Sequence, residues 1–205
     1  MQTLAIVARK GGVGKSFICR SLAVVALRYR LPSAIVDCDS QETCIKWAKR
    51  RSIKAPAVIP PPIEIALDRL RRAGAKLVLL DCPPFALPLI NQAVAAADRS
   101  IIVSEPLPES LEQIAPIASI VRALNKPACI VLNKCQPRSN ANNLALSALT
   151  AFGLPVAPII TQRISHAYAS ANGQAAEEYE TGGMAAIEIR KLWEWLVERE
   201  FIKMA

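Results

Sequence analysis

Short apolar runs rich in Val, Ile and Leu recur along the chain and alternate with segments of helical spacing. The runs predict strands at residues 3–8, 33–39, 76–83, 99–105, 127–134 and 155–161. After the first run, apolar positions follow a helical spacing at Ile18, Leu22, Val25 and Tyr29. Continuous apolar runs are typical of strands that are buried on both faces. Their alternation with helices therefore predicts an α/β fold with a mostly parallel central sheet flanked by helices.

The segment KAPAVIPPP, residues 54–62, interrupts this alternation. Its consecutive prolines cannot continue a helix, so the segment predicts an extended connector, followed by a helix over residues 63–74. The sequence contains no internal repeat and no low-complexity tract. With 205 residues, 52% of them hydrophobic, the chain predicts a single domain over residues 1–205.

The N-terminal apolar stretch LAIVA is short and runs straight into a glycine-rich loop, which is unlike a secretory signal. No apolar run reaches the length that crosses a membrane, so we expect a cytoplasmic protein that does not bind membranes. The six cysteines lack C-x-x-C spacing and stand at Cys19, Cys38, Cys44, Cys82, Cys129 and Cys135. Most lie beside apolar residues, and we expect reduced cysteines in the core rather than disulfides or zinc ligands.

The formal net charge of +8 and the high isoelectric point, about 9.4, favour a polyanion as a partner. Basic residues crowd one segment, at Lys46, Lys49, Arg50, Arg51 and Lys54. No acidic residue interrupts the chain between Thr43 and Ile63. Charge alone leaves open whether this run is a solvated helix face or a binding patch.

A phosphate-binding loop follows the first predicted strand directly. The stretch RKGGVGKS, residues 9–16, stands between that strand and the first helix, as such a loop requires. Its three glycines, at positions 11, 12 and 14, allow backbone N–H groups to turn inward around phosphates at a helix N-terminus. We expect Lys15 to contact the β- and γ-phosphates of a nucleotide, and the Ser16 hydroxyl to bind Mg²⁺.

Carboxylates end two of the predicted strands. Asp81 closes the apolar run LVLLD, where an acidic side chain is typical of a magnesium site, although it could also cap the following turn. Asp37 and Asp39 end another run. Side chains two positions apart in a strand point the same way, so we expect both to face the phosphates. One could support Mg²⁺ while the other orients an attacking water.

Five motifs in order resemble the ParA/MinD family of ATPases, which carry a deviant Walker A phosphate loop. They are KGGVGKS at 10–16, DCDSQ at 37–41, DCPP at 81–84, VLNK at 131–134 and TQRISHAYASANGQAAEEY at 161–179. Together they span nearly the whole chain. The resemblance implies a P-loop NTPase fold of the deviant Walker A group. One departure is Ser40, where the family commonly has proline; we expect this serine to cap the following helix.

The resemblance also implies ATP and Mg²⁺ as cofactors and an ATP-dependent homodimer. In this dimer Lys10 would cross into the facing subunit and contact the partner's nucleotide, much as an arginine finger does. The implied catalytic residues are Lys10, Lys15 and Asp39, with Asp39 positioning the water. The implied nucleotide contacts are Lys10, Gly11, Gly12, Val13, Gly14, Lys15, Ser16, Phe17 and, for adenine, Asn133. The implied metal residues are Ser16, Asp37 and the Walker B acid Asp81.

Within the family the chain looks like the short ParF-like (type Ib) partition ATPases, because the loop at residue 9 leaves no room for an N-terminal helix-turn-helix domain. That likeness implies a weak ATPase stimulated by nonspecific DNA and by a ParB-like or other adaptor protein. It also implies nucleoid association and the partition or positioning of a plasmid, a chromosome or another cargo. The DNA contacts that the likeness suggests are Arg163, Arg190 and Lys191.

Alternatives of other classes remain open. A MinD-like spatial regulator would bind a membrane through its last helix, but acids dilute the basic charge of residues 185–205, and the apolar stripe there predicts packing on the sheet. A metabolic P-loop ligase would need no lysine in a partner subunit. An iron–sulfur reductase would need a second cysteine paired with Cys82. His166, the single histidine, is expected at the surface or in an interface.

Overall fold

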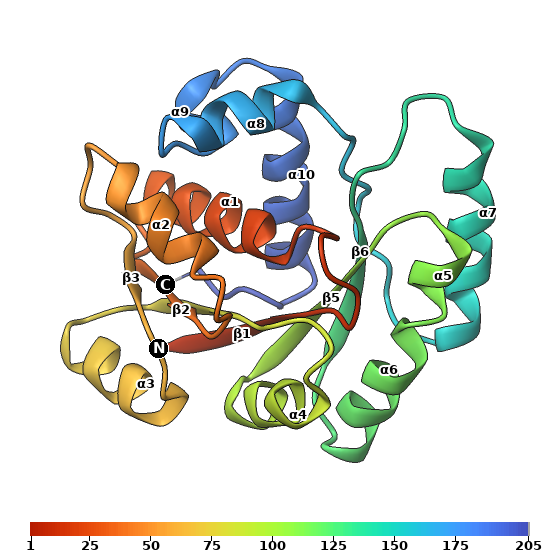
Figure 1. Cartoon of the computed structure of the whole chain (residues 1–205), viewed down its shortest axis with the longest axis horizontal. Coiled ribbons are helices and arrows are strands. Elements are labelled where there is room, and N and C mark those ends of the chain that lie inside the picture. The colour runs from red at the N-terminus through yellow and green to blue at the C-terminus, as the bar shows by residue number, and fades with distance from the viewer. Residues whose placement is uncertain (205) are drawn as a thin grey trace.

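The computed structural model describes residues 1–204 and is built around one parallel β-sheet (Figure 1). Its strands, in the order β3-β2-β4-β1-β5-β6 across the sheet, all pair in parallel. Their bounds are β1 (Gln2–Val7), β2 (Ser33–Asp37), β3 (Ala57–Ile59), β4 (Leu77–Asp81), β5 (Arg99–Ser104) and β6 (Ala128–Leu132). The predicted fold class, a parallel sheet flanked by helices, is confirmed.

Helices cover both faces of the sheet (Figure 1). One face packs against α1 (Lys15–Arg28), α2 (Thr43–Arg50) and α10 (Met184–Glu198), and α8 (Ile164–Ala171) and α9 (Ala176–Tyr179) lie beyond α1. The other face packs against α3 (Ile63–Arg72), α4 (Leu87–Ala96), α6 (Ile114–Ala123) and α7 (Asn140–Leu149). Two short helices complete the connections, α5 (Pro108–Leu111) and the 3₁₀ helix η1 (Thr150–Phe152).

The apolar runs form strands because each strand contributes to two cores. In β1, Leu4 and Ile6 point to the core under α1, whereas Ala5 and Val7 point to the core under α4. A strand sandwiched in this way needs apolar residues at consecutive positions rather than at alternate ones. This is the pattern from which the strands were predicted.

Two segments differ from the sequence-based prediction. Residues 155–161 form no strand within the described chain; they lie beside β6 through isolated bridges at Val156 and Thr161 and a hydrogen bond from the Ile160 N–H to the Leu132 carbonyl oxygen. Pro155 and Pro158 supply no N–H groups for a continuous ladder, which explains the interruption. Conversely, the predicted connector at 54–62 contains β3, whose three residues precede the prolines and pair with β2 at the edge of the sheet.

The last helix packs on the sheet as predicted. Ile189, Leu192, Trp193 and Leu196 are all buried in the core that α10 shares with α1. The cysteines also lie where expected: five of the six are buried, and Cys38 is partly buried. Among the described residues, no helix combines the length and the apolar character needed to cross a membrane.

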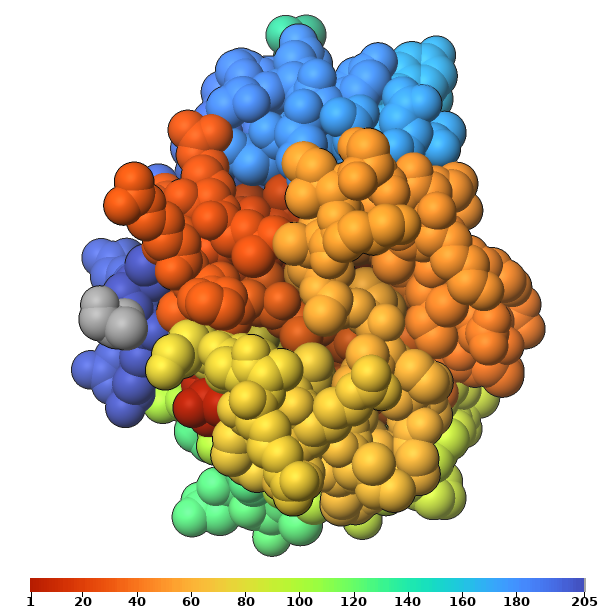
Figure 2. Space-filling model, turned by 90° about the vertical axis from the view of Figure 1, so that its left-hand side faces the viewer, coloured from red at the N-terminus to blue at the C-terminus, as the bar shows by residue number. Residues whose placement is uncertain are grey.

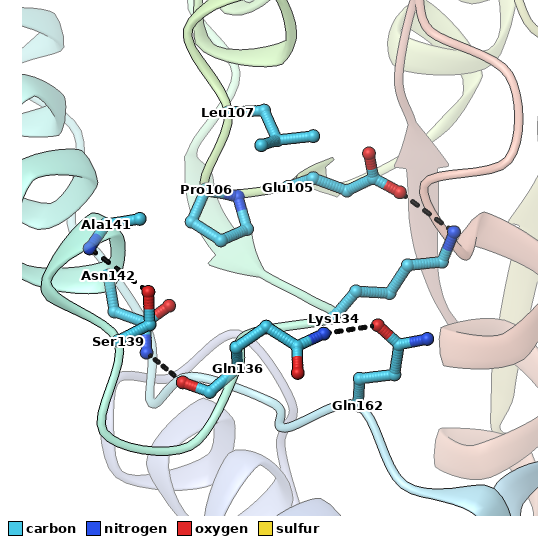
Figure 3. Close-up of a pocket in the computed structure, with 9 residues that line it drawn as sticks. All are labelled: Glu105, Pro106, Leu107, Lys134, Gln136, Ser139, Ala141, Asn142 and Gln162. Carbon is cyan, nitrogen blue, oxygen red and sulfur yellow. Dashed lines mark hydrogen bonds and ion pairs between the residues drawn. The ribbon is translucent and has the colours of Figure 1, made fainter.

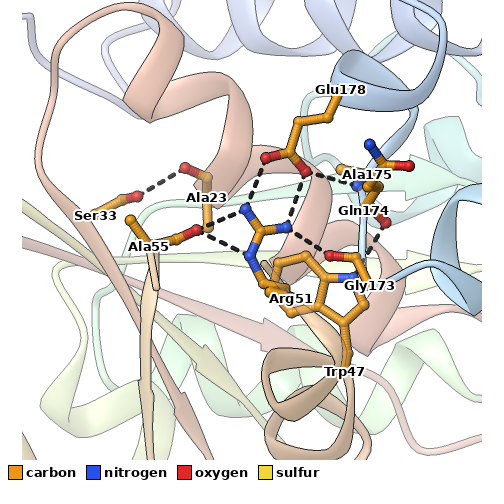
Figure 4. A network of polar contacts seen from close by, with 9 residues as sticks. All are labelled: Ala23, Ser33, Trp47, Arg51, Ala55, Gly173, Gln174, Ala175 and Glu178. Atoms are coloured by element: carbon orange, nitrogen blue, oxygen red, sulfur yellow. Dashed lines mark hydrogen bonds and ion pairs between the residues drawn. The ribbon is translucent and has the colours of Figure 1, made fainter. Parts of the chain in front are cut away.

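Arg51 is buried, unlike the exposed basic residues that neighbour it in the sequence (Figure 4). Its side chain is only 3% exposed and bonds with Glu178 at 2.7 Å, and its guanidinium also donates to the carbonyl oxygens of Ala55 and Gly173. The same group lies 4.4 Å from the ring centroid of Trp47. Arg51 therefore joins the end of α2 to the α8–α9 segment, and counting it with a surface patch was wrong.

Replacing Arg51 tests the energetic weight of this network. Arg51→Ala leaves the Glu178 carboxylate without its main partner, and removing one member of a buried ion pair costs about 3–5 kcal/mol of unfolding free energy. Arg72→Ala is the matched control, because Arg72 is 80% exposed in its pair with Asp68 and such pairs contribute about 0–1 kcal/mol. Urea unfolding measures both. Equal losses would contradict a structural role for Arg51.

Candidate functional site

The loop between β1 and α1 lines a cavity of about 430 Å³ at the carboxyl end of the sheet. The loop amides, the N-terminus of α1 and two strand ends converge here, because Ile6 of β1 and Asp37 of β2 both pair with Asp81 of β4. The residues that line the cavity include the predicted contacts Gly11, Gly12, Gly14, Lys15, Ser16 and Phe17. A glycine-rich loop opening a helix is a ready site for phosphates.

Gly14 is required by a close approach. Its φ of +102° lies in the left-handed region, and a Cβ built on it would stand 2.1 Å from the Asn133 amide nitrogen. That nitrogen donates a hydrogen bond of 2.8 Å to the carbonyl oxygen of buried Val13. Asn133, predicted as an adenine contact, thus holds the phosphate loop from the end of β6. Its contact with a base stays a prediction.

Lys15 is buried although its side chain lines the phosphate cavity. It is 6% exposed, and burial lowers the pKa of its ammonium group, an effect that Asp81 and Asp39 partly oppose. A buried charge is costly unless it is paired. An anion in the cavity would supply the missing partner, which is the role predicted for a nucleotide phosphate.

Asp81 carries an unsatisfied oxygen at the same place. Its carboxylate is fully buried; one oxygen accepts the Cys44 thiol at 3.2 Å, and the other has no hydrogen-bond partner among the described residues. Burial raises the pKa of Asp81 to about 6, against smaller lowering effects from the Ser16 hydroxyl and the Cys44 thiol. An orphaned buried carboxylate oxygen beside a hydroxyl fits a hard divalent cation. The residues present therefore suit Mg²⁺.

Asp37 has a structural role that the sequence did not reveal. One of its oxygens accepts the backbone N–H groups of Cys44 and Ile45, at 2.9 and 3.0 Å, in the first turn of α2. The expectation that Ser40 caps this helix was wrong, because α2 begins at Thr43 and its N-cap position is Glu42, two residues after Ser40. Asp37 still lies close to the metal-binding candidates: ligand atoms of Asp37, Cys44 and Asp81 lie within 4.8 Å of one another.

Asp39 lines the phosphate cavity, as predicted, but for a different reason. Strand β2 ends at Asp37, so alternation along a strand does not direct the Asp39 side chain. The following turn does: an Asp39 oxygen accepts the N–H of Gln41 at 3.0 Å. Asp39 is only partly buried and thus faces both the cavity and solvent.

A second cavity, of about 280 Å³, adjoins the first and shares Gly14, Phe17 and Arg20 with it. Its remaining lining residues are Asn133, Lys134, Thr161, Gln162, Arg163, His166, Ala167 and Ser170. The segment after β6 and helix α8 thus wall a space beside the phosphate loop. Its size and its position suit a nucleobase whose phosphates occupy the first cavity.

The lining of this second cavity includes residues that were not predicted, among them His166 and Arg20. His166, expected at the surface or in an interface, packs edge-on against Phe17 with ring centroids 4.5 Å apart, and neither ring nitrogen has a partner among the described residues. Burial lowers the pKa of His166 to about 4, so its ring is neutral at pH 7. Arg20 donates to the carbonyl oxygen of Ser16 at 3.1 Å and to the Ser170 hydroxyl at 2.9 Å. A helical spacing of four from Ser16 was the only signal for Arg20.

Lys10 lies outside the lining of its own phosphate cavity. Its ammonium group donates to the Ser110 hydroxyl at 2.8 Å and lies 3.5 Å from Glu109 and 3.6 Å from Glu105. Glu105 also pairs with Lys134 at 2.8 Å, and both residues line a third cavity of about 370 Å³ between the segment before α5 and the start of α7 (Figure 3). The two lysines of the loop therefore point to different places.

The predicted DNA contacts are largely engaged within the chain. Arg163 binds Glu188 at 2.6 Å beside the second cavity. Arg190 binds Glu177 at the same distance, and Lys191 alone of the three is exposed. The structure does not bring these three together as one open basic surface.

Comparison with known proteins places this geometry in context. The sequence profile of the CobQ/CobB/MinD/ParA nucleotide binding domain matches residues 4–176. A search of curated proteins gave no match. Solved structures gave many matches, and the three described next share 14–16% sequence identity with this chain.

Three of these structures illustrate the range. MinD in the MinC:MinD cell division complex of Aquifex aeolicus has a TM-score of 0.80 at 14% identity, covering 100% of this chain and 99% of that one. MinD of Pyrococcus horikoshii with Mg-ADP has a TM-score of 0.75 at 16% identity, covering 97% of each chain. A plasmid partition protein of Borrelia burgdorferi bound to AMPPNP has a TM-score of 0.74 at 15% identity, covering 97% and 99%. At such identities the likeness concerns the fold.

The raised pKa of Asp81 gives a prediction on stability. Because the pKa is about 6 in the folded chain against an ordinary 3.8, the folded state holds this proton more tightly than the unfolded state. Stability is therefore lost as the pH rises from about 4 to about 6, and ionised Asp81 costs stability at pH 7. Asp81→Asn should raise the unfolding free energy of the nucleotide-free protein by about 1–3 kcal/mol at pH 7.

Urea unfolding at pH 4.5 and pH 7.5 measures this effect. The advantage of Asp81→Asn should narrow at the lower pH, where wild-type Asp81 is protonated in the folded chain. A variant that is less stable than wild type at pH 7.5 would contradict the prediction.

Proposed function

The chain belongs to the ParA/MinD family, and on that basis we propose that it is a Mg²⁺-dependent ATP hydrolase that acts as an ATP-dependent homodimer. The observation that carries this proposal is the separation of the two lysines of one loop. Lys15 is buried against the phosphate cavity, whereas Lys10 contacts α5 and lines none of that cavity. Lys15 would serve the chain's own nucleotide, and Lys10, once released from its contacts at α5, would serve a second one.

The two adjoining cavities support ATP as the ligand. The triphosphate would lie along the loop amides and Lys15, and the base beside Phe17 and Asn133. Ser16 and Asp81 would hold Mg²⁺, with Asp37 nearby to bind its water shell. When bound, Mg²⁺ neutralises charge on the β- and γ-phosphates.

Hydrolysis requires a water aligned with the γ-phosphate. Asp39 is our candidate for this task, because Asp39 and Lys15 both line the phosphate cavity and the Asp39 carboxylate partly offsets the lowering of the Lys15 pKa by burial. Its partial exposure gives solvent access to the same place. We assign Asp39 to orient the attacking water.

Lys10 completes the site from the facing subunit. A second positive charge near the transferred phosphoryl group would stabilise charge that develops during hydrolysis. In the single chain the ammonium group is held by Ser110, Glu109 and Glu105 instead. Turnover would therefore be slow until dimerisation draws Lys10 toward the partner's nucleotide, in accord with a weak ATPase that other factors stimulate.

The cellular role we propose is the partition or positioning of a plasmid, a chromosome or another cargo. The dimer would bind nonspecific DNA, associate with the nucleoid in the cytoplasm, and be stimulated by a ParB-like or other adaptor. The net charge of +8 supports a polyanionic partner. The likeness of the fold to a plasmid partition protein supports this class of role.

A MinD-like spatial regulator is the second candidate, and the likeness of the fold to MinD favours it. Membrane attachment through α10 would need an exposed apolar face, yet the apolar stripe of this helix lies in the core. A metabolic P-loop ligase is disfavoured by Lys10, since a small-molecule ligase does not require a lysine directed to a second nucleotide.

The two lysines should separate binding from turnover. Lys15→Ala should abolish tight ATP binding, because the phosphates lose their main counter-ion within the chain. Lys10→Ala should keep ATP affinity within about threefold of wild type but remove the stimulation of hydrolysis by DNA and adaptor. Calorimetry with Mg-ATP and a phosphate-release assay measure the two effects. Stimulated turnover in Lys10→Ala equal to wild type would refute the role in the partner site.

Asp39→Ala should separate hydrolysis from assembly. The variant loses the carboxylate that orients water but keeps Lys15, Ser16 and Asp81, so it should bind Mg-ATP without turnover and accumulate as a dimer. Light scattering with ATP and with ADP measures the mass. A variant that stays monomeric with ATP would contradict the proposal.

A further inference from the structure

The positive charge of the chain is concentrated on one edge of the molecule. Residues 40–76 hold nine basic and three acidic side chains, a net charge of +6 out of the +8 of the whole chain. They form α2, β3, α3 and the connection to β4. In Figure 2 these segments, coloured orange to yellow, make up most of one face, where the sheet ends at strand β3.

The basic side chains of this edge are open to solvent. Eight are exposed, and we call them the edge patch: Lys46, Lys49, Arg50, Lys54, Arg69, Arg71, Arg72 and Lys76. Within residues 1–204, only Arg72 of these eight has a carboxylate partner. By contrast, Arg163 and Arg190, the arginines that the family resemblance suggested as DNA contacts, are each bound to a glutamate.

The packing of α2 and α3 favours a partner that carries phosphates over a membrane. Both helices bury their apolar faces against the sheet, α2 through Trp47 and α3 through Leu67 and Leu70. Of the large apolar residues in residues 40–76, Ile53 and Ile65 are the ones exposed. A membrane-binding helix needs a continuous apolar face in addition to charge, and the edge patch has none. A surface of lysines and arginines alone recognises phosphates without reading bases.

We propose that the edge patch is the surface that binds the backbone of duplex DNA. The inference rests on the DNA binding included in the proposed function and assigns it to α2 and α3 rather than to the C-terminal segment. Dimerisation would double the patch, which makes binding depend on nucleotide state. Because the contacts are with phosphates, affinity is the same for all sequences and falls steeply with salt.

The test compares charge reversals of equal size. The first variant, Lys54→Glu/Arg69→Glu, changes one residue before β3 in the sequence and one after it. The second, independent variant is Lys49→Glu/Lys76→Glu. None of these four side chains makes a hydrogen bond within the described chain. The control is Arg138→Glu/Lys203→Glu, an equal change of charge on exposed residues elsewhere. The probe is a fluorescent 40-base-pair duplex, measured by anisotropy against salt with ATP and with ADP.

Each edge variant should bind the duplex at least about tenfold more weakly at low salt and flatten the salt dependence by about two units of slope. The control should stay within about twofold of wild type. ATP affinity and thermal unfolding should match wild type in all three variants, which separates loss of the surface from loss of the fold.

Other results overturn the inference in distinguishable ways. Edge variants that bind as wild type does, or a control that loses as much as they do, would place the DNA surface elsewhere while leaving DNA binding intact. A wild-type protein that binds no duplex with ATP would reject DNA binding in the proposed function itself. Vesicles containing phosphatidylglycerol form the last arm: binding to them that the edge variants abolish, without binding to DNA, would make the partner a membrane.

Discussion

The site depends on two buried charged side chains that the chain alone does not fully satisfy, Lys15 and Asp81. They lie where β1 and β4 end side by side; within residues 1–204 one Asp81 oxygen has no hydrogen-bond partner, and burial lowers the pKa of Lys15. A buried charge without a partner lowers the free energy of unfolding. Buried charges of this kind are therefore typical of sites where a charged ligand supplies the partner. The surrounding features follow from holding this pair in position: Cys44 against Asp81, Asn133 against the loop, and a glycine where no Cβ fits.

Helix α2 links this centre to the rest of the site. At the start of this helix, the Asp37 carboxylate accepts a backbone N–H group of the first turn. Just beyond the end of the helix, Arg51 binds Glu178 and the Gly173 carbonyl oxygen. The segment tied there follows α8, which walls the second cavity. Helix α2 therefore connects the strand end that carries Asp37 to the segment after α8, on the base side of the site. Its outward face belongs to the edge patch, so the same helix joins nucleotide and surface.

Most of the fold and much of the site could be predicted from the sequence, because the signals were local. Strands buried on both faces gave continuous apolar runs, and the phosphate-loop residues are contiguous. The errors have physical causes: β3 is only three residues long and is followed by prolines, while the run at 155–161 contains two prolines. Arg51 and His166 owe their surroundings to segments distant in sequence, which no local pattern encodes.

The shortness of β3 has a consequence for crowding. A long open strand at the edge of a sheet invites another sheet to pair with it, and many copies gathered on one polyanion would meet often. Here the outer strand stops after three residues, at a run of prolines that offer no N–H groups. At the opposite edge, Val156 and Thr161 already occupy positions beside the β6 segment. Within the described residues, both borders of the sheet therefore offer little backbone with which a neighbouring molecule could pair.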